Sequence, residues 1–116
     1  MSSSTTQPDQ LPATIRAYLS AHEARDVEAA LRAFGPRAVV VDQGQTFRGT
    51  SAIRDFLREA GAPFSYTIEL VGARQVDDTR WVATNRLEGD FPGGVAELDY
   101  RFTLDGDVIT ELVIGP

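Results

Sequence analysis

The 116-residue sequence contains no lysine and no cysteine, and its only histidine is His22. Without lysine, the chain cannot form a Schiff base through a lysine amine or carry the lysine of a phosphate-binding P-loop. Without cysteine, it has no thiol nucleophile, no disulfide and no thiolate metal site. A single histidine excludes a three-histidine zinc site within one chain. Acid–base chemistry is therefore left to carboxylates, tyrosines, one imidazole and arginines, and we expect neither a metal nor a cofactor.

The chain is acidic, with 17 Asp+Glu against 11 Lys+Arg and a formal net charge of −6. Its cations are all arginines and are scattered, which argues against nucleic acid as a partner. No apolar run approaches the roughly 20 residues that cross a bilayer, so we expect no membrane partner. The first residues lack the basic start and apolar stretch of a signal peptide. We expect a cytoplasmic protein with a disordered tail over 1–8 and a single domain over 9–116.

Three segments in the first half have the apolar periodicity of amphipathic helices. The first covers 9–22, and the second begins at Asp26, a typical N-cap residue. We expect the second helix to include Phe34, because the glycine and proline that follow commonly end a helix. The third segment covers 49–60 and ends at a glycine. The first half is therefore predicted to be mainly helical, interrupted by one short buried strand over 38–42.

The second half changes its period from 3.6 to 2, which is typical of strands. Turn residues such as Asp77-Asp78 separate four strand-like segments. These segments lie at 64–76, 80–91, 95–104 and 108–114. Helices followed by a long meander predict an α+β fold, with three N-terminal helices packed on a curved, mostly antiparallel sheet. Such a sheet encloses either a filled core or a cone with a cavity.

The residues that carry these caps, turns and core positions resemble those of a known superfamily. They are Tyr18, Ala21, Arg25-Asp26-Val27, Leu31, Phe34, Val40-Val41-Asp42, Arg48-Gly49-Thr50, Ile53-Arg54, Phe56, Gly89 to Gly94, Leu98, Tyr100 to Leu104, Gly106, Ile109, Leu112 and Ile114. The pattern is similar to that of the nuclear transport factor 2-like superfamily, and most of all to its SnoaL-like branch. The resemblance implies a cone-shaped α+β barrel of the cystatin-like type, often dimeric through its sheet. The superfamily includes isomerases, cyclases, dehydratases, hydrolases and non-catalytic binding domains, so the fold does not choose an activity.

The chain also resembles the ketosteroid isomerases of this superfamily at three positions. Tyr18 corresponds to their hydrogen-bonding tyrosine, Asp42 to their carboxylate base and Asp99 to their protonated aspartic acid. The resemblance implies that Asp42 would take a proton while Tyr18 and Asp99 would polarise a carbonyl. The residue after Asp42 is Gln43, where those enzymes have proline.

Each of these residues has a structural alternative. Tyr18 lies on the apolar stripe of its helix, and an aromatic residue at such a position usually belongs to the core. Asp42 is followed by Gln-Gly, so its carboxylate could bind the backbone of its own turn. If the strand instead directs Asp42 into a cavity, desolvation would raise its pKa and make it a usable base. Both alternatives stay open for each residue.

Asp99 is the most informative of the three positions. Glu97, Asp99 and Arg101 alternate along one strand and therefore share a face. Arg101 would favour the ionised form of Asp99, whereas a hydrogen-bond donor must keep its proton. A salt-bridged surface explains the three residues more simply.

The remaining candidates are His22 and a set of potential ligand contacts. His22 lies one turn after Tyr18 and could relay a proton, although a lone histidine at a helix end is more often simply hydrogen-bonded. Residues that could contact a ligand are Phe34, Phe56, Trp81 and Arg101. The aromatic residues Phe64, Tyr66 and Phe91 could equally line a cavity or fill it.

Two functional hypotheses follow. In the first, a cone cavity binds a small, largely hydrophobic molecule and performs cofactor-free acid–base catalysis of the isomerase, cyclase or dehydratase type. In the second, the domain is a non-catalytic module for ligand binding or dimerisation. A homodimer that forms through the sheet is expected in either case.

Overall fold

The computed structural model describes residues 11–59 and 66–116. The tail over 1–8, the start of the first helix near Asp9, Phe64 and the glycine expected to end the third helix lie outside the described residues. The chain folds into three helices and six strands in the order α1(Ala13–Glu23), α2(Val27–Leu31), β1(Phe34–Asp42), β2(Gln45–Arg48), α3(Gly49–Glu59), β3(Tyr66–Gln75), β4(Arg80–Gly89), β5(Val95–Asp105) and β6(Val108–Gly115). The expected α+β class is confirmed.

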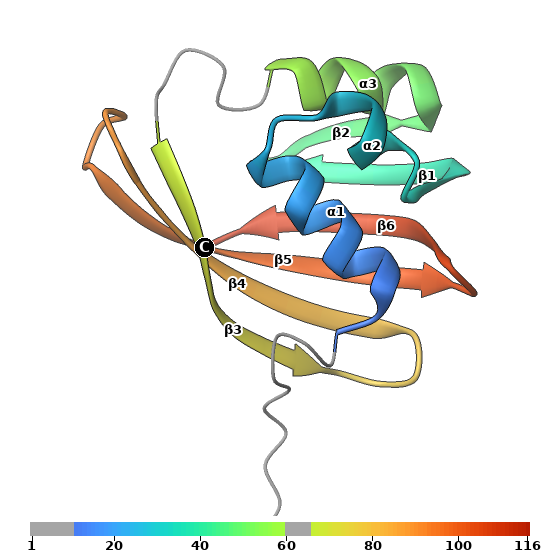
Figure 1. The fold of residues 1–116 in the computed structure, drawn as a ribbon. Helices are drawn as coiled ribbons and strands as arrows, with labels where there is room; N and C mark the ends of the chain where they lie inside the picture. The colour runs from blue at the N-terminus through green and yellow to red at the C-terminus, as the bar shows by residue number, and fades with distance from the viewer. Residues whose placement is uncertain (1–10, 60–65) are drawn as a thin grey trace, which may run out of the picture.

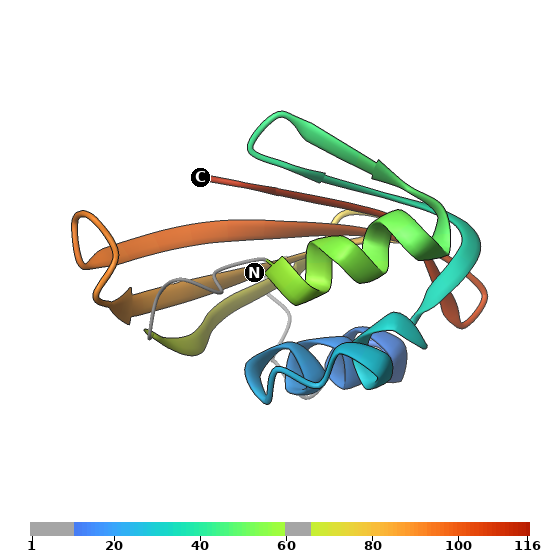
Figure 2. The same ribbon diagram turned by 90° about the horizontal axis from the view of Figure 1, so that it is seen from above.

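All six strands belong to one curved sheet in the order β2-β1-β6-β5-β4-β3. Neighbouring strands are antiparallel except β1 and β6, which run parallel. The three helices lie on the same side of the sheet, on its concave face (Figures 1 and 2). None of the described helices is long and apolar enough to cross a membrane.

The second helix is shorter than the sequence pattern predicts. Asp26 caps it as expected, because its carboxylate accepts a hydrogen bond of 3.1 Å from the Ala29 backbone N–H. The helix ends at Leu31, however, and Phe34 begins β1 instead of continuing the helix. The backbone of this segment pairs with β6, where the Ile109 N–H donates to the Ala33 carbonyl at 2.8 Å. Pairing with a distant strand therefore overrides the local helical pattern.

Side chains alternate between the two faces of the sheet, and the register aligns them in rows. Val40, Leu112, Phe102 and Trp81 form one row across four strands on the concave face. The next row contains Asp42, Ile114, Tyr100 and Ala83. Both rows contribute to the core, and each contacts α1: Phe102 meets the Tyr18 ring and Tyr100 meets the His22 ring.

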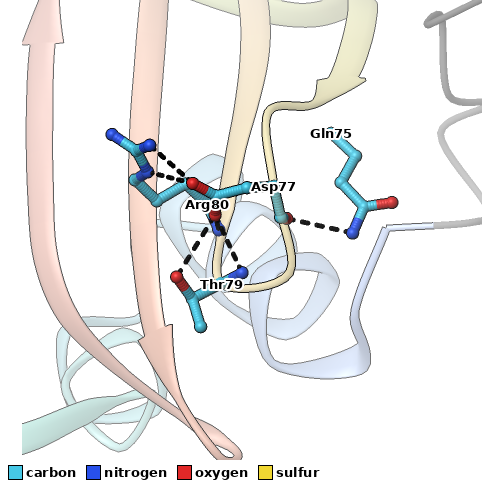
Figure 3. A network of polar contacts seen from close by, with 4 residues as sticks. All are labelled: Gln75, Asp77, Thr79 and Arg80. Atoms are coloured by element: carbon cyan, nitrogen blue, oxygen red, sulfur yellow. Dashed lines mark hydrogen bonds and ion pairs between the residues drawn. The ribbon is translucent and has the colours of Figure 1, made fainter.

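The turn between β3 and β4 is held by the side chain of Asp77 (Figure 3). Its carboxylate accepts hydrogen bonds from the backbone N–H groups of Thr79 and Arg80, each at 3.0 Å, and from Arg80 Nε at 2.7 Å. These bonds, with the one from Arg80 contributing most, lower the pKa of Asp77 to about 2. Gln75 Nε2 donates to the Asp77 carbonyl at 3.0 Å. The acidic pair predicted to mark a turn thus forms one by direct capping of the backbone.

Candidate functional site

A cavity of about 360 Å³ lies between the concave face of the sheet and helices α1 and α3, and we name it the central cavity. Most of its surface is apolar and is formed by Phe56, Leu87, Phe91, Ala96, Leu98 and Ile114. Polar groups reach it from His22, Asp42, Gln43, Tyr66 and Tyr100. A concave, mainly apolar site with a few polar groups is the usual form of a small-molecule site, and the volume lies within the usual range of about 300–1,000 Å³.

Asp42 is placed in this cavity by its position at the end of β1. It follows Ala38 and Val40 at alternate positions, so its side chain leaves the strand on the same face as those core residues. The turn to β2 consists of Gln43 and Gly44, both with positive φ (51° and 83°), as in the tight turns that suit β-hairpins. Among the described residues, none donates a hydrogen bond to the Asp42 carboxylate, and burial raises its pKa. The side chain therefore faces the cavity and does not cap its own turn.

His22 and Tyr100 form a polar pair in the same cavity as Asp42. His22 Nε2 lies 3.2 Å from the Tyr100 hydroxyl oxygen, and both residues line the central cavity. Burial, with a smaller contribution from the charge of Arg25, lowers the pKa of His22 to about 4. Burial also raises the pKa of Tyr100, with further contributions from Tyr66 and Asp42. At neutral pH the pair therefore consists of a neutral imidazole and a protonated phenol.

Tyr18 lies in the core behind this pair and is not among the cavity-lining residues. Its ring stacks on His22 with centroids 5.6 Å apart and planes at 8°, and it makes edge contacts with Phe34 and Phe102. The side chain is fully buried, and its hydroxyl has no hydrogen-bond partner among the described residues. Burial raises the pKa of Tyr18 far above its usual value, so the phenol stays protonated. In this arrangement Tyr18 holds the plane of the His22 ring.

Asp99 and Arg101 lie on the opposite, convex face of the sheet. The Asp99 carboxylate accepts a hydrogen bond of 2.6 Å from the Thr84 hydroxyl, and Arg101 Nη2 lies 3.3 Å from its other oxygen. Their neighbours in β5, Tyr100 and Phe102, face the concave side, because adjacent residues of a strand point to opposite faces. The structure therefore brings Asp42 together with His22 and Tyr100, but it does not bring Asp99 or Arg101 to the cavity.

The predicted ligand contacts also differ in position. Phe56 lines the central cavity, whereas Phe34 is buried in the core against Tyr18. Trp81 is on the concave face but packs against the core and does not line the cavity. Tyr66 and Phe91, which the sequence left undecided, both line it, and their rings meet edge to face at 6.3 Å.

Two polar residues of the concave face were missed in the sequence. Tyr100 alternates with Leu98 and Phe102 in β5, and this apolar alternation was the available signal that it faces inward. Asn85 is only 1% exposed, and its Nδ2 has no hydrogen-bond partner among the described residues. Asn85 pairs with Leu98 across β4 and β5, and its alternation with Ala83 and Leu87 was the corresponding signal. Within residues 11–59 and 66–116, no three acidic or histidine side chains lie close enough to hold a metal ion.

The chain matches the SnoaL-like domain family over residues 15–111. Together with the fold, this match shows the class of protein: the chain belongs to the SnoaL-like domain family, within the nuclear transport factor 2-like superfamily. No curated protein matches the chain.

Solved structures of similar fold extend this comparison. A candidate polyketide cyclase from Sinorhizobium meliloti is 31% identical, with a TM-score of 0.86 over 95% of this chain and 100% of that one. The Δ5-3-ketosteroid isomerase from a Mycobacterium species shares the fold, with 19% identity, a TM-score of 0.72 and 90% of each chain covered. A protein with a ketosteroid isomerase-like fold from Catenulispora acidiphila, in complex with trimethylamine, is 16% identical, with a TM-score of 0.78 over 90% of this chain and 85% of that one.

Proposed function

We propose that this SnoaL-like domain binds a small, largely hydrophobic carbonyl compound in the central cavity and moves a proton at the carbon next to the carbonyl, without a cofactor. The observation that carries the proposal is the position of Asp42. Its carboxylate enters a mainly apolar cavity in the same cross-strand row as Tyr100, and no described residue donates a hydrogen bond to it.

Asp42 acts as the base in this proposal. Burial raises its pKa, so its carboxylate binds a proton more tightly than an exposed aspartate does. A carboxylate with few hydrogen bonds is free to accept a proton from carbon. When it does, the electrons of the C–H bond move into the carbonyl group and leave an enolate with negative charge on oxygen.

Tyr100 and His22 stabilise that oxygen. The phenol keeps its proton at neutral pH because burial raises its pKa. When Nε2 of the neutral His22 carries the ring proton, it donates to the Tyr100 oxygen and leaves the phenol O–H to donate to the ligand. A preorganised donor at a developing oxyanion is usually the largest electrostatic contribution to such a reaction. The proton held by Asp42 then returns to another carbon in an isomerisation. In an aldol-type cyclisation, the enolate carbon instead attacks a second carbonyl, and the alkoxide that forms takes up this proton.

The similarity to the candidate polyketide cyclase supports a carbonyl compound as the ligand, because it extends over nearly the whole chain at 31% identity. The apolar surface of the cavity supports a ring-sized hydrophobic body. The absence of lysine excludes an enamine route through a lysine amine, which leaves direct proton abstraction by a carboxylate.

The proposal is tested by deuterium exchange of 2-tetralone in D₂O, followed by proton NMR, since exchange reports proton abstraction without knowledge of the natural substrate. The wild type should accelerate exchange above the buffer rate. Asp42→Asn should reduce this acceleration by about 100-fold, the usual contribution of a general base. Tyr100→Phe should reduce it by about 10- to 100-fold, because it removes the oxyanion donor.

Asp78→Asn is the matched control, because Asp78 is exposed in the turn between β3 and β4. It should leave exchange within about twofold of the wild type, as expected for a surface change. Exchange by Asp42→Asn at the wild-type rate would remove Asp42 as the base. Binding of 2-tetralone by the wild type, seen by saturation-transfer NMR, without accelerated exchange would favour the non-catalytic binding module.

A further inference from the structure

A second pocket of about 260 Å³ opens beside the central cavity at the C-terminal end of α1, and we name it the arginine pocket. Its polar residues are His22, Arg25, Asp26, Arg58 and Tyr66. His22 and Tyr66 also line the central cavity, so the two spaces share these side chains as a common boundary. A ligand longer than one ring system could occupy both.

The arginine pocket differs from the central cavity in charge. Two arginines and one aspartate line it, in a chain with a formal net charge of −6. The Asp26 carboxylate is already engaged, since it caps α2 through the Ala29 N–H. Within the described part of the chain, no carboxylate forms an ion pair with Arg58. Arginines therefore outnumber carboxylates among the described residues that line the pocket, in a chain whose formal net charge is negative.

Arg25 is held over the boundary between the two spaces. Its guanidinium carbon lies 4.6 Å from the centroid of the Tyr66 ring, a cation–π distance. Arg25 follows His22 by three residues and lines the arginine pocket with it, and its charge contributes to the lowered pKa of His22. Its backbone has φ of 58°, an uncommon conformation for a residue other than glycine. This conformation ends α1, because the Asp26 N–H donates to the Ala21 carbonyl at 2.9 Å and the Arg25 N–H donates to the His22 carbonyl at 3.1 Å.

We propose that the ligand of this domain is an amphipathic organic anion, with an apolar body in the central cavity and an anionic group, such as a carboxylate, bound by Arg25 and Arg58 in the arginine pocket. The proposal rests on the proposed function and adds the substrate class. Anchoring a remote charged group would also hold the reacting carbon near Asp42, since binding energy at a distant group can fix the geometry at the reacting centre.

Two fluorescent probes with the same apolar skeleton separate the contribution of the charge. They are 8-anilinonaphthalene-1-sulfonate, which is an anion, and N-phenyl-1-naphthylamine, which lacks the sulfonate and is neutral. Both should bind the wild type by fluorescence titration. The double variant Arg25→Asn/Arg58→Gln should weaken the anionic probe by about tenfold or more and leave the neutral probe within about twofold, because only the charged group loses its partners.

The variants are chosen to preserve the fold. Asparagine tolerates the positive φ of Arg25, and Arg58 is exposed near the end of α3. Arg37→Gln is the matched control, since Arg37 is exposed on β1 outside both spaces. It removes the same charge and should change both affinities by less than about twofold. Arg58→Lys keeps the charge and should retain most of the anionic probe's affinity.

The inference would be overturned if the double variant lost the same affinity for both probes. It would also be overturned if Arg37→Gln weakened the anionic probe as much as the double variant does. Failure of both probes to bind the wild type would overturn it together with the proposed apolar site. The proposed proton transfer is decided separately by the exchange assay with Asp42→Asn. Suppose that the wild type accelerates exchange of neutral 2-tetralone but its affinity for the anionic probe does not depend on the two arginines. The proposed function would then stand, and only the substrate class would be refuted.

Discussion

The concave and convex faces of the sheet are built from the same strands but have different physical properties. In β5, Tyr100 and Phe102 are almost completely buried on the concave face, whereas Asp99 and Arg101 pair with each other on the convex face. Only the parity of a residue's position separates the two sets. The difference shows that a charged residue next to a cavity residue in sequence can lie on the opposite face of the sheet.

Asp99 on the convex face and Asp42 on the concave face have different surroundings. Asp99 receives a hydrogen bond from Thr84 and an ion pair from Arg101. Asp42 receives no hydrogen bond from the described residues, and burial raises its pKa. Both oxygens of the Asp99 carboxylate thus have partners, whereas the Asp42 carboxylate has none among the described residues. One face therefore places a carboxylate in an ion pair, and the other places a carboxylate in a mainly apolar cavity.

The largest expected difference between the faces is in stability. Phe102→Ala should lower the free energy of unfolding by about 3–5 kcal/mol, because it leaves a cavity where a side chain only 1% exposed was packed. Arg101→Ala, the neighbouring change on the convex face, should cost less than about 1 kcal/mol, since it removes an exposed ion pair. Urea unfolding measures both. Similar costs for the two variants would contradict the assignment of faces.

A smaller effect concerns the pH dependence contributed by His22. Its folded pKa of about 4 lies below its ordinary value of 6.5, so the unfolded chain binds the proton more tightly. The His22 contribution is therefore complete above pH 6.5 and is lost as the pH falls toward about 4. Between about pH 7 and about pH 5, the wild type should lose up to about 2 kcal/mol of stability from this group.

His22→Gln removes this titration and should flatten that part of the profile. The raised pKa of Asp42 acts in the opposite direction, because the folded state then holds its proton more tightly. Asp42 is present in both proteins, so the difference between their urea unfolding profiles isolates His22. Parallel profiles for wild type and variant would show that His22 is not buried as a neutral imidazole.

A third test concerns the Tyr18 hydroxyl, which is buried without a partner among the described residues. Tyr18→Phe should be neutral or stabilising by up to about 1 kcal/mol, because it removes a desolvated polar group and keeps the ring that stacks on His22. The deuterium-exchange rate should stay within about threefold of the wild type if Tyr100 is the donor. A large loss of exchange with intact folding would return the donor role to Tyr18, as the resemblance to the ketosteroid isomerases implies.

The smallest effect is expected from Asp99→Asn. The Asp99–Arg101 pair is partly exposed, so its loss should cost about 0.5 kcal/mol or less in urea unfolding. The 2-tetralone exchange rate should stay within about twofold of the wild type, since Asp99 lies on the convex face. A loss of exchange comparable to that of Asp42→Asn would mean that Asp99 takes part in the chemistry despite its position.

Much of the fold could be predicted from the sequence because local signals and tertiary structure agree. The strands of the second half were placed within a few residues of β3 to β6, since alternation of apolar residues and turn signals both mark them. The pattern was misleading at Phe34. The glycine and proline after it were interpreted as the end of the second helix, but both belong to β1. Pairing with β6 is a contact between distant residues, which local periodicity does not report.

The candidate site was only partly predictable. Asp42 could be proposed because a polar residue ends an apolar strand, and Phe56 because it lies on the apolar stripe of α3. Tyr100 was missed because a tyrosine in a strand is equally typical of a core or a site. The roles proposed for Asp42, Tyr18, His22 and Asp99 stay predictions, as does the homodimer expected through the sheet.

The sequence by itself determined the chemistry available and the class of fold. The lack of lysine and cysteine and the single histidine leave carboxylates, phenols, one imidazole and arginines as the acid–base groups, whatever the conformation. Periodicity determined the α+β class, because a helix and a strand bury different spacings of residues. Tertiary structure alone decided which of these groups meet. Strand register placed Asp42 and Tyr100 in one cross-strand row, on either side of Ile114. The packing of α1 brought His22 Nε2 to 3.2 Å from the Tyr100 hydroxyl oxygen across 78 residues of sequence, a proximity that depends on contacts no local pattern encodes.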